Sequence, residues 1–129
     1  MTAVLDAWAA LAFLRGEPAA PRVKELILAE EALISSINLG EALYWTERRL
    51  GQRQAREEVD RLRPVLVVED PDWPLVGAAA HLKAGGGLSY ADAFCVATAQ
   101  RHDATLYTGD PEILALDVPV EMVDLRETS

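Results

Sequence analysis

Short apolar runs alternate along this chain with longer segments in which apolar residues recur every three or four positions. The runs start near residues 3, 32, 65 and 104, and their length and content are typical of buried β-strands. The segments between them have the periodicity of helices that pack one side against a core. This alternation predicts a parallel sheet that is covered by helices on both faces.

The predicted elements follow each other without an internal repeat or a domain linker. Strands are predicted at 3–5, 32–35, 65–68, 104–107 and 118–123, the last at a sheet edge because it contains Pro119. Helices are predicted at 7–15, from Pro18 and Pro21 to about 30, at 37–50, 52–63, 72–84 and 88–102, and briefly after Pro111. The polar tail, 124–129, is expected to be loose. The predicted fold is a three-layer α/β/α sandwich with a mostly parallel five-stranded sheet, formed by residues 1–129 as one domain.

The composition narrows the class of protein. The chain has 129 residues, which suits one domain with its own hydrophobic core. Its single cysteine, Cys95, excludes an internal disulfide framework and any multi-cysteine zinc or iron–sulfur site. The first residues lack the features of a signal peptide, and no apolar run reaches the roughly 18 residues that a membrane span requires. We therefore expect a cytoplasmic protein with no membrane partner.

The net charge of −9 argues against general binding to nucleic-acid phosphates, which favour basic surfaces. Half of the twelve basic residues nevertheless lie within residues 48–63: Arg48, Arg49, Arg53, Arg56, Arg61 and Arg63. Acidic residues are interleaved with them, which favours a solvated helix face. A surface that contacts RNA or a protein partner is the alternative.

Four acidic residues occupy related places in the predicted fold. Asp6 follows the first strand, and Asp110 follows the fourth strand after a short turn. Asp92 lies in the first turn of the buried helix 88–102, and Glu41 lies in an early turn of the helix 37–50. In parallel α/β sheets, ligands bind outside the carboxyl ends of the strands. We therefore predict that these four carboxylates converge at one edge of the sheet.

Three of these acids also have a purely local explanation. Asp6 and Asp110 can cap the helices that follow them, and Asp92 can form a capping box with Ser89. Glu41 lies five residues past Ser36, the expected cap of its helix, and is too far along to be a cap. Only the combination with Glu41 favours a shared site over separate caps.

A gathering of carboxylates has a chemical consequence. Like charges about 4 Å apart repel by roughly 4 kcal/mol at an effective dielectric constant of 20, so the cluster would attract a cation. Hard oxygen ligands without histidine or cysteine favour Mg²⁺ or Mn²⁺ over zinc. Such a site can activate water for attack on phosphorus, which predicts a phosphodiester hydrolase.

The same residues, in this order, resemble the motifs of PIN-domain nucleases, and most closely the toxins of VapBC-type toxin–antitoxin systems. The matching segments are Val4-Leu5-Asp6, Ser36 through Glu41, Leu88-Ser89 with Asp92-Ala93, and Thr108-Gly109-Asp110. The resemblance implies an endoribonuclease that uses Mg²⁺, with Mn²⁺ able to substitute. It also implies a homodimer that is inhibited by a small cognate antitoxin protein.

Carried over by position, the resemblance assigns catalytic and metal-binding roles to Asp6, Glu41, Asp92 and Asp110. It makes Ser36 and Thr108 supporting hydroxyl groups. One departure is Ile113, where the family often has an aromatic residue, and we attribute this difference to packing.

The remaining candidates for chemistry are expected to be structural. Cys95 is predicted to be an inert core thiol, and His81 and His102 are not expected to take part in catalysis. The large aromatic residues are predicted to be core or dimer contacts rather than surfaces that stack on bases: Trp8, Trp45, Trp73 and Phe94.

Two other classes of function stay open. A phospho-receiver domain has a similar length, but it needs an acid pair after the first strand and a lysine after the last. Here Ala7 and Trp8 follow Asp6, and the only lysines are Lys24 and Lys83. A non-catalytic PIN-like scaffold is the other alternative, and the complete set of four acids argues against it.

Overall fold

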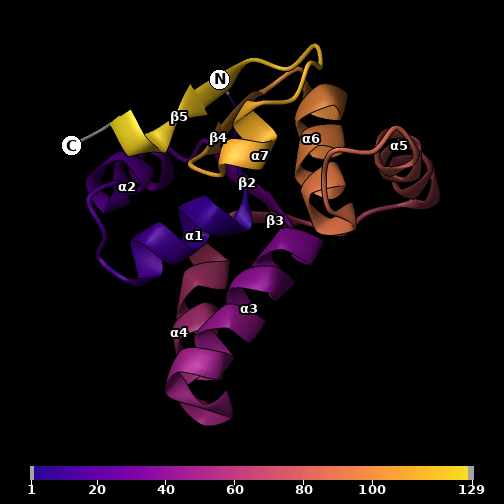
Figure 1. The fold of residues 1–129 in the computed structure, drawn as a ribbon. Coiled ribbons are helices and arrows are strands. Elements are labelled where there is room, and N and C mark those ends of the chain that lie inside the picture. Colours follow the sequence, from indigo (N-terminus) through magenta and orange to yellow (C-terminus); the bar gives the residue numbers. More distant parts are fainter. Residues whose placement is uncertain (1, 128–129) are drawn as a thin grey trace.

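The computed structural model describes residues 2–127 and contains one five-stranded sheet with helices on both faces (Figure 1). The strand order is β3-β2-β1-β4-β5, and every neighbouring pair is parallel. The strands are β1 (Ala3–Leu5), β2 (Ala32–Ser35), β3 (Val67–Glu69), β4 (Thr105–Thr108) and β5 (Met122–Asp124). The predicted α/β/α fold is confirmed. Receiver domains have the order 2-1-3-4-5, so the strand order excludes that alternative.

Seven helices surround the sheet within the described residues. They are α1 (Ala7–Leu14), α2 (Ala20–Leu28), α3 (Ser36–Leu50), α4 (Gln52–Leu62), α5 (Trp73–Ala84), α6 (Tyr90–His102) and α7 (Pro111–Leu114). Short 3₁₀ turns lie at Arg63–Val65 and Leu125–Glu127. None of the helices in residues 2–127 is long and apolar enough to cross a lipid bilayer.

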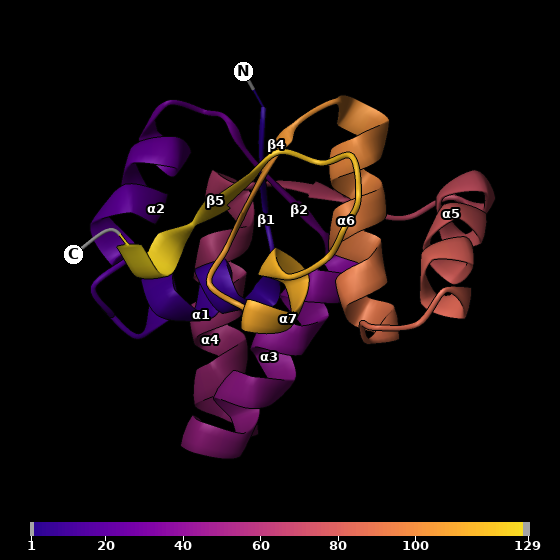
Figure 2. The same ribbon diagram turned by 45° about the horizontal axis from the view of Figure 1, so that its top comes forward.

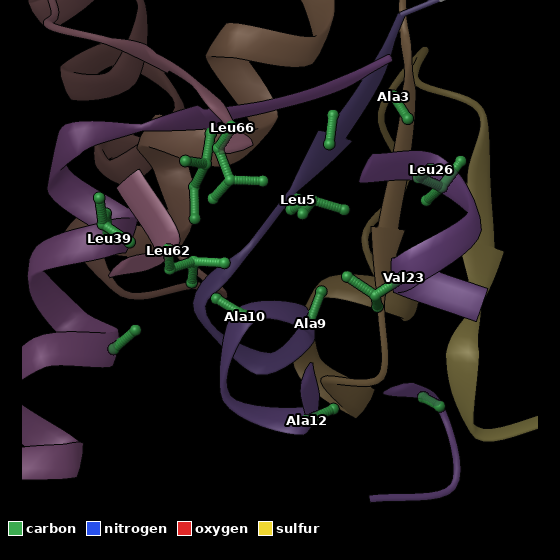
Figure 3. Close-up of a cluster of buried hydrophobic side chains, with 14 of the residues drawn as sticks. Ala3, Leu5, Ala9, Ala10, Ala12, Val23, Leu26, Leu39, Leu62 and Leu66 are labelled. Carbon is green, nitrogen blue, oxygen red and sulfur yellow. The ribbon is translucent and has the colours of Figure 1, made fainter. Parts of the chain in front are cut away.

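The central strand β1 contributes to two hydrophobic cores, because successive side chains of a strand point to opposite faces. Leu5 packs against α1, α2, α3 and α4 in one core, as Figure 3 shows. Val4 packs against α6 in the other core, to which α5 and α7 also contribute. Both residues are almost completely buried. The end of β1, where Asp6 lies, is therefore held from both sides of the sheet.

Helix α6 is the most buried helix, as its apolar sequence predicts. Every residue from Asp92 to Ala99 is buried, because α6 packs between the sheet and α5. Packing on several sides fixes the first turn of α6, and with it the backbone of Asp92.

Two predicted boundaries in the first half of the chain are wrong. The cap of α3 is Ser35 instead of Ser36, because the Ser35 hydroxyl accepts a hydrogen bond from the Ile37 N–H (3.3 Å). The third strand starts at Val67 instead of residue 65, because the 3₁₀ turn at Arg63–Val65 extends the path of α4 around Pro64. Apolar residues before the strand belong to this turn, where Val65 is 50% exposed.

The C-terminal part also differs from the prediction. The fifth strand is an edge strand, as expected, but it covers only Met122–Asp124, and Pro119 lies before it. The tail is not loose over its first residues: Leu125 is 1% exposed and packs in the core beside Leu5. Residues 128–129 lie outside the described part of the chain.

Candidate active site

The structure brings the four predicted acids together. Asp6, Glu41, Asp92 and Asp110 line one pocket of about 340 Å³. The elements that supply them, which include α1, α3 and α7, gather at one end of the sheet in Figure 2. The remaining walls come from five other residues: Ala7, Trp8, Leu11, Arg15 and Trp45.

Neighbouring strands β1 and β4 position two of the acids through one hydrogen-bond network. The Asp6 carboxylate accepts hydrogen bonds from the Ala9 N–H (2.9 Å), as the cap of α1, and from the Thr108 hydroxyl. The Thr108 oxygen accepts a hydrogen bond from the Asp110 N–H (2.9 Å), which leaves its own proton for Asp6. Thr108 therefore links the backbone of one acid to the carboxylate of another.

The turn between Thr108 and Asp110 depends on a glycine. A Cβ atom at Gly109 would lie 2.3–2.5 Å from atoms of the Trp8 indole ring, which is too close for any side chain. Asp110 then caps α7 by accepting a hydrogen bond from the Glu112 N–H (2.9 Å). Gly109 thus allows Trp8 to pack against the backbone beside Asp110, a role that the sequence pattern did not reveal.

The first turn of α6 holds Asp92. The Ser89 hydroxyl accepts a hydrogen bond from the Asp92 N–H (3.1 Å), as the predicted capping box requires. One turn further, the Cys95 thiol donates to the Asp92 carbonyl oxygen (3.0 Å). Cys95 is completely buried, and burial raises the pKa of its thiol well above the usual value, so it is an inert core residue.

The remaining acid, Glu41, has a partner that the sequence analysis missed. The side-chain amide of Asn38 donates hydrogen bonds to the Glu41 carboxylate (2.9 Å) and to the Ala91 carbonyl oxygen (2.9 Å). The sequence contained one signal for this partner: a polar residue lies one turn before Glu41, on the inward side of α3. Ser36 lies elsewhere, in a groove that Leu39 and Arg56 also line.

The sequence profile of the PIN domain family matches residues 3–119. The chain belongs to the PIN domain family. No curated protein sequence matches it.

Several solved structures share this fold. VapC20 of Mycobacterium tuberculosis, described as a toxin that cleaves the sarcin–ricin loop, is 23% identical with a TM-score of 0.72, over 93% of this chain and 99% of that one. DNA-bound VapBC of Salmonella typhimurium is 18% identical with a TM-score of 0.79, over 97% and 98%. FitAcB of Neisseria gonorrhoeae is 21% identical with a TM-score of 0.75, over 98% and 99%. These likenesses establish the fold.

The electrostatics of this PIN domain are unusual at the pocket. Burial raises the pKa of Asp6 to about 7, against the hydrogen bonds from Thr108 and Ala9, and the carboxylates of Asp110 and Asp92 raise it further. Burial also raises the pKa of Glu41 and of Asp92, and nearby carboxylates add to both effects. The acids therefore share one electrostatic environment that disfavours their simultaneous ionisation.

The donor set fits a hard divalent cation, although the side chains do not form a closed shell. Within residues 2–127, no three or more His, Cys, Asp or Glu side chains are arranged closely enough to hold a metal ion as they stand. An incomplete set of oxygen ligands suits Mg²⁺, which keeps several waters and binds proteins through a few carboxylates. The same set does not suit a structural zinc ion, which needs a complete tetrahedral set.

Two arginines of the arginine-rich segment of the PIN domain, both on α4, pair with acids one turn further along that helix. Arg53 lies 3.5 Å from Glu57, and Arg56 lies 3.8 Å from Asp60. These side chains are exposed, which agrees with the solvated helix face that the sequence favoured. Arg48 differs, because its guanidinium group lies 5.0–5.3 Å from the ring centres of Trp45 and Tyr44.

Proposed function

We propose that this PIN domain is a metal-dependent endoribonuclease that hydrolyses RNA phosphodiester bonds as the toxin of a toxin–antitoxin pair. The observation behind the proposal is the pocket at the carboxyl ends of β1 and β4. Four carboxylates from different elements line it, and burial together with their mutual repulsion raises the pKa of Asp6, Glu41 and Asp92. A protein retains such a costly arrangement where the charges have a ligand to bind.

In this proposal the four acids hold Mg²⁺, for which Mn²⁺ can substitute. The cation would supply positive charge to the phosphate and lower the pKa of water for attack on phosphorus. Thr108 would keep one oxygen of Asp6 oriented, and the helix cap at Ala9 would keep the other. Since the pKa of Asp6 is about 7, this residue gives up its proton most readily when a cation takes the proton's place.

An RNA substrate is supported by the wall of the pocket as well as by its acids. Trp45 lines the pocket and is 44% exposed, and the Arg48 guanidinium lies over its ring. An exposed ring beside a phosphate-binding site can stack on a base. Of the two roles that the sequence suggested, core or dimer contact, the exposure of Trp45 and of Trp73, which is 80% exposed, excludes the core for both.

The biological setting is proposed by analogy with the structural neighbours. VapC20 is described as a toxin that cleaves the sarcin–ricin loop, and the Salmonella structure is of DNA-bound VapBC. We propose that this chain likewise forms a homodimer, acts in the cytoplasm and is inhibited by a small cognate antitoxin.

The test is RNA cleavage by purified protein with Mn²⁺ or Mg²⁺, followed on single-stranded RNA. We expect cleavage that EDTA abolishes and that Asp92→Asn reduces by roughly 1,000-fold, since metal-ion catalysis is worth several kcal/mol. Equal cleavage by Asp92→Asn and wild type would refute the assignment. Wild-type protein that neither cleaves RNA nor binds Mn²⁺ would support the non-catalytic scaffold instead.

A further inference from the structure

The Asn38 side chain is a buried polar group that connects α3 to α6. It is 0% exposed, and its amide nitrogen donates to Glu41 on its own helix and to Ala91 on α6, 53 residues away. Both contacts measure 2.9 Å. One amide therefore uses both of its protons to join two parts of the acid pocket.

The orientation of this amide follows from its partners. A carboxylate and a backbone carbonyl both accept hydrogen bonds, so the nitrogen of the amide must face them. The oxygen, Oδ1, then lies buried without a hydrogen-bond partner within the part of the chain that the structure describes. A buried unpaired carbonyl destabilises a fold, so it offsets part of the stability that the two donated hydrogen bonds provide.

The two bonds have a direct consequence for the pocket. Ala91 immediately precedes Asp92, so Asn38 connects the carboxylate of Glu41 to the backbone that bears Asp92. Glu41 has a long side chain on a partly exposed part of α3, and the hydrogen bond restricts it to one orientation. The partners that orient metal ligands are known to affect metal affinity strongly.

We propose that Asn38 is a positioning residue that fixes Glu41 relative to Asp92 and thereby sets the affinity of the acid pocket for a divalent cation. The inference rests on the proposed function, since it assumes that the acids bind a cation. Asn38 acts through Glu41 and need not touch the cation or the RNA.

Asn38→Leu separates this role from a structural one. Leucine is close to asparagine in size and leaves no buried amide oxygen, but it also removes both donated hydrogen bonds, so we expect the melting temperature to fall by several degrees. We also expect the dissociation constant for Mn²⁺, measured by calorimetric titration well below the melting temperature, to rise by about 10- to 100-fold. A merely structural residue would lower the melting temperature without weakening Mn²⁺ binding by the folded protein.

A control on the same helix tests whether any buried change weakens binding. Thr46 is 4% exposed and donates a hydrogen bond to the Ala42 carbonyl oxygen (2.7 Å), about two turns past Asn38. Thr46→Val removes this bond at nearly constant shape, and we expect unchanged Mn²⁺ affinity. Equal loss of affinity in Thr46→Val and Asn38→Leu would overturn the proposal.

A double mutant tests the route through Glu41. Asn38→Leu should weaken Mn²⁺ binding far less in a Glu41→Gln background than in wild type, because the group that Asn38 orients is already altered. Full additivity would contradict the proposal, as would wild-type Mn²⁺ affinity in Asn38→Leu. If wild-type protein itself binds no Mn²⁺, the proposed metal site fails, and that result is distinct from a failure confined to Asn38.

Discussion

Asp6 and Asp72 have the same local task in different parts of the molecule. Each is the cap of a helix: Asp6 accepts a hydrogen bond from the Ala9 N–H (2.9 Å), and Asp72 accepts one from the Leu75 N–H (3.0 Å). Their pKa values nevertheless move in opposite directions. The pKa of Asp6 rises to about 7, whereas that of Asp72 falls below its ordinary value.

The surroundings of the two aspartates explain the difference. Asp72 is exposed, and the Arg101 guanidinium lies 2.6 Å from it and stabilises its charged form. Its neighbour Glu69 lies 2.5 Å from the His102 ring. Asp6, in contrast, is 2% exposed and has carboxylates near it. Capping is common to both regions, so the distinguishing property of the pocket is that buried acids face other acids.

The largest contrast is expected in catalysis. Asparagine caps a helix as well as aspartate does, so Asp6→Asn and Asp72→Asn each remove a charge and keep the cap. We expect Asp6→Asn to lower kcat/KM for RNA cleavage by roughly 1,000-fold and Asp72→Asn to leave it unchanged. Equal activities of the two variants in a fluorogenic RNA assay would remove the functional distinction between the regions.

The pH dependence of stability should differ in sign. In EDTA, the protonated Asp6 favours the folded state, so its contribution is complete below pH 3.8 and is lost as the pH rises through about 7. At about 1.4 kcal/mol per pKa unit, this loss is on the order of 4 kcal/mol. The lowered pKa of Asp72 gives a contribution that is present above 3.8 and is lost as the pH falls.

Urea unfolding of wild type, Asp6→Asn and Asp72→Asn between about pH 4 and pH 8 measures these contributions. As the pH rises, the free energy of unfolding of wild type should fall relative to that of Asp6→Asn, because only wild type has a buried carboxyl group at position 6 that must lose its proton. Parallel curves for these two proteins would show that the charge of Asp6 costs nothing in the folded state.

Binding of a cation should offset the free energy that ionisation of Asp6 costs in the folded protein. At about 100 times its dissociation constant, Mn²⁺ stabilises the folded state by about 2.7 kcal/mol, which corresponds to a melting temperature higher by on the order of 10 °C. Differential scanning fluorimetry should show this rise in wild type and in Asp72→Asn, and a smaller one in Asp6→Asn. A rise of the same size in all three proteins would place the cation outside the pocket.

The smallest contrast concerns two exposed tryptophans. Trp45 lines the acid pocket, whereas Trp73 directly follows Asp72 at the start of α5. Stacking on a base is worth about 1–3 kcal/mol, so Trp45→Ala should raise KM for RNA by about tenfold or more, with a smaller change in kcat. Trp73→Ala should change neither. Light scattering on both variants is the control, and a Trp45→Ala variant that loses its dimer with unchanged KM would make Trp45 a dimer contact.

The fold was predictable because its signals are local. The apolar run at 32–35 forms β2 with the predicted bounds, and the periodicity of residues 88–102 predicts the buried helix that forms there. The third strand was less predictable, since apolar residues continue from a 3₁₀ turn into the strand and their periodicity does not separate the two. Leu125 was assigned to a loose tail because one apolar residue gives no period.

The site was predictable only in part, for a related reason. Acids that follow strands must meet at one edge of a parallel sheet, so topology alone brings Asp6 and Asp110 together. The contact of Asn38 with Ala91 and that of Gly109 with Trp8 depend on how two helices pack on the sheet. No spacing along the chain encodes such contacts, and a structure was needed to find them.

The hydrogen bond between Asp6 and Thr108 has a consequence for folding during protein synthesis. The two residues are 102 positions apart, and Thr108 is the last residue of β4, which is the direct neighbour of β1. Contacts over such distances form late, because most of the chain must be present before they can close. A nascent chain on the ribosome therefore has no acid pocket until β4 has emerged. If the protein cleaves RNA, it can do so only after Thr108 and Asp110 have been synthesised.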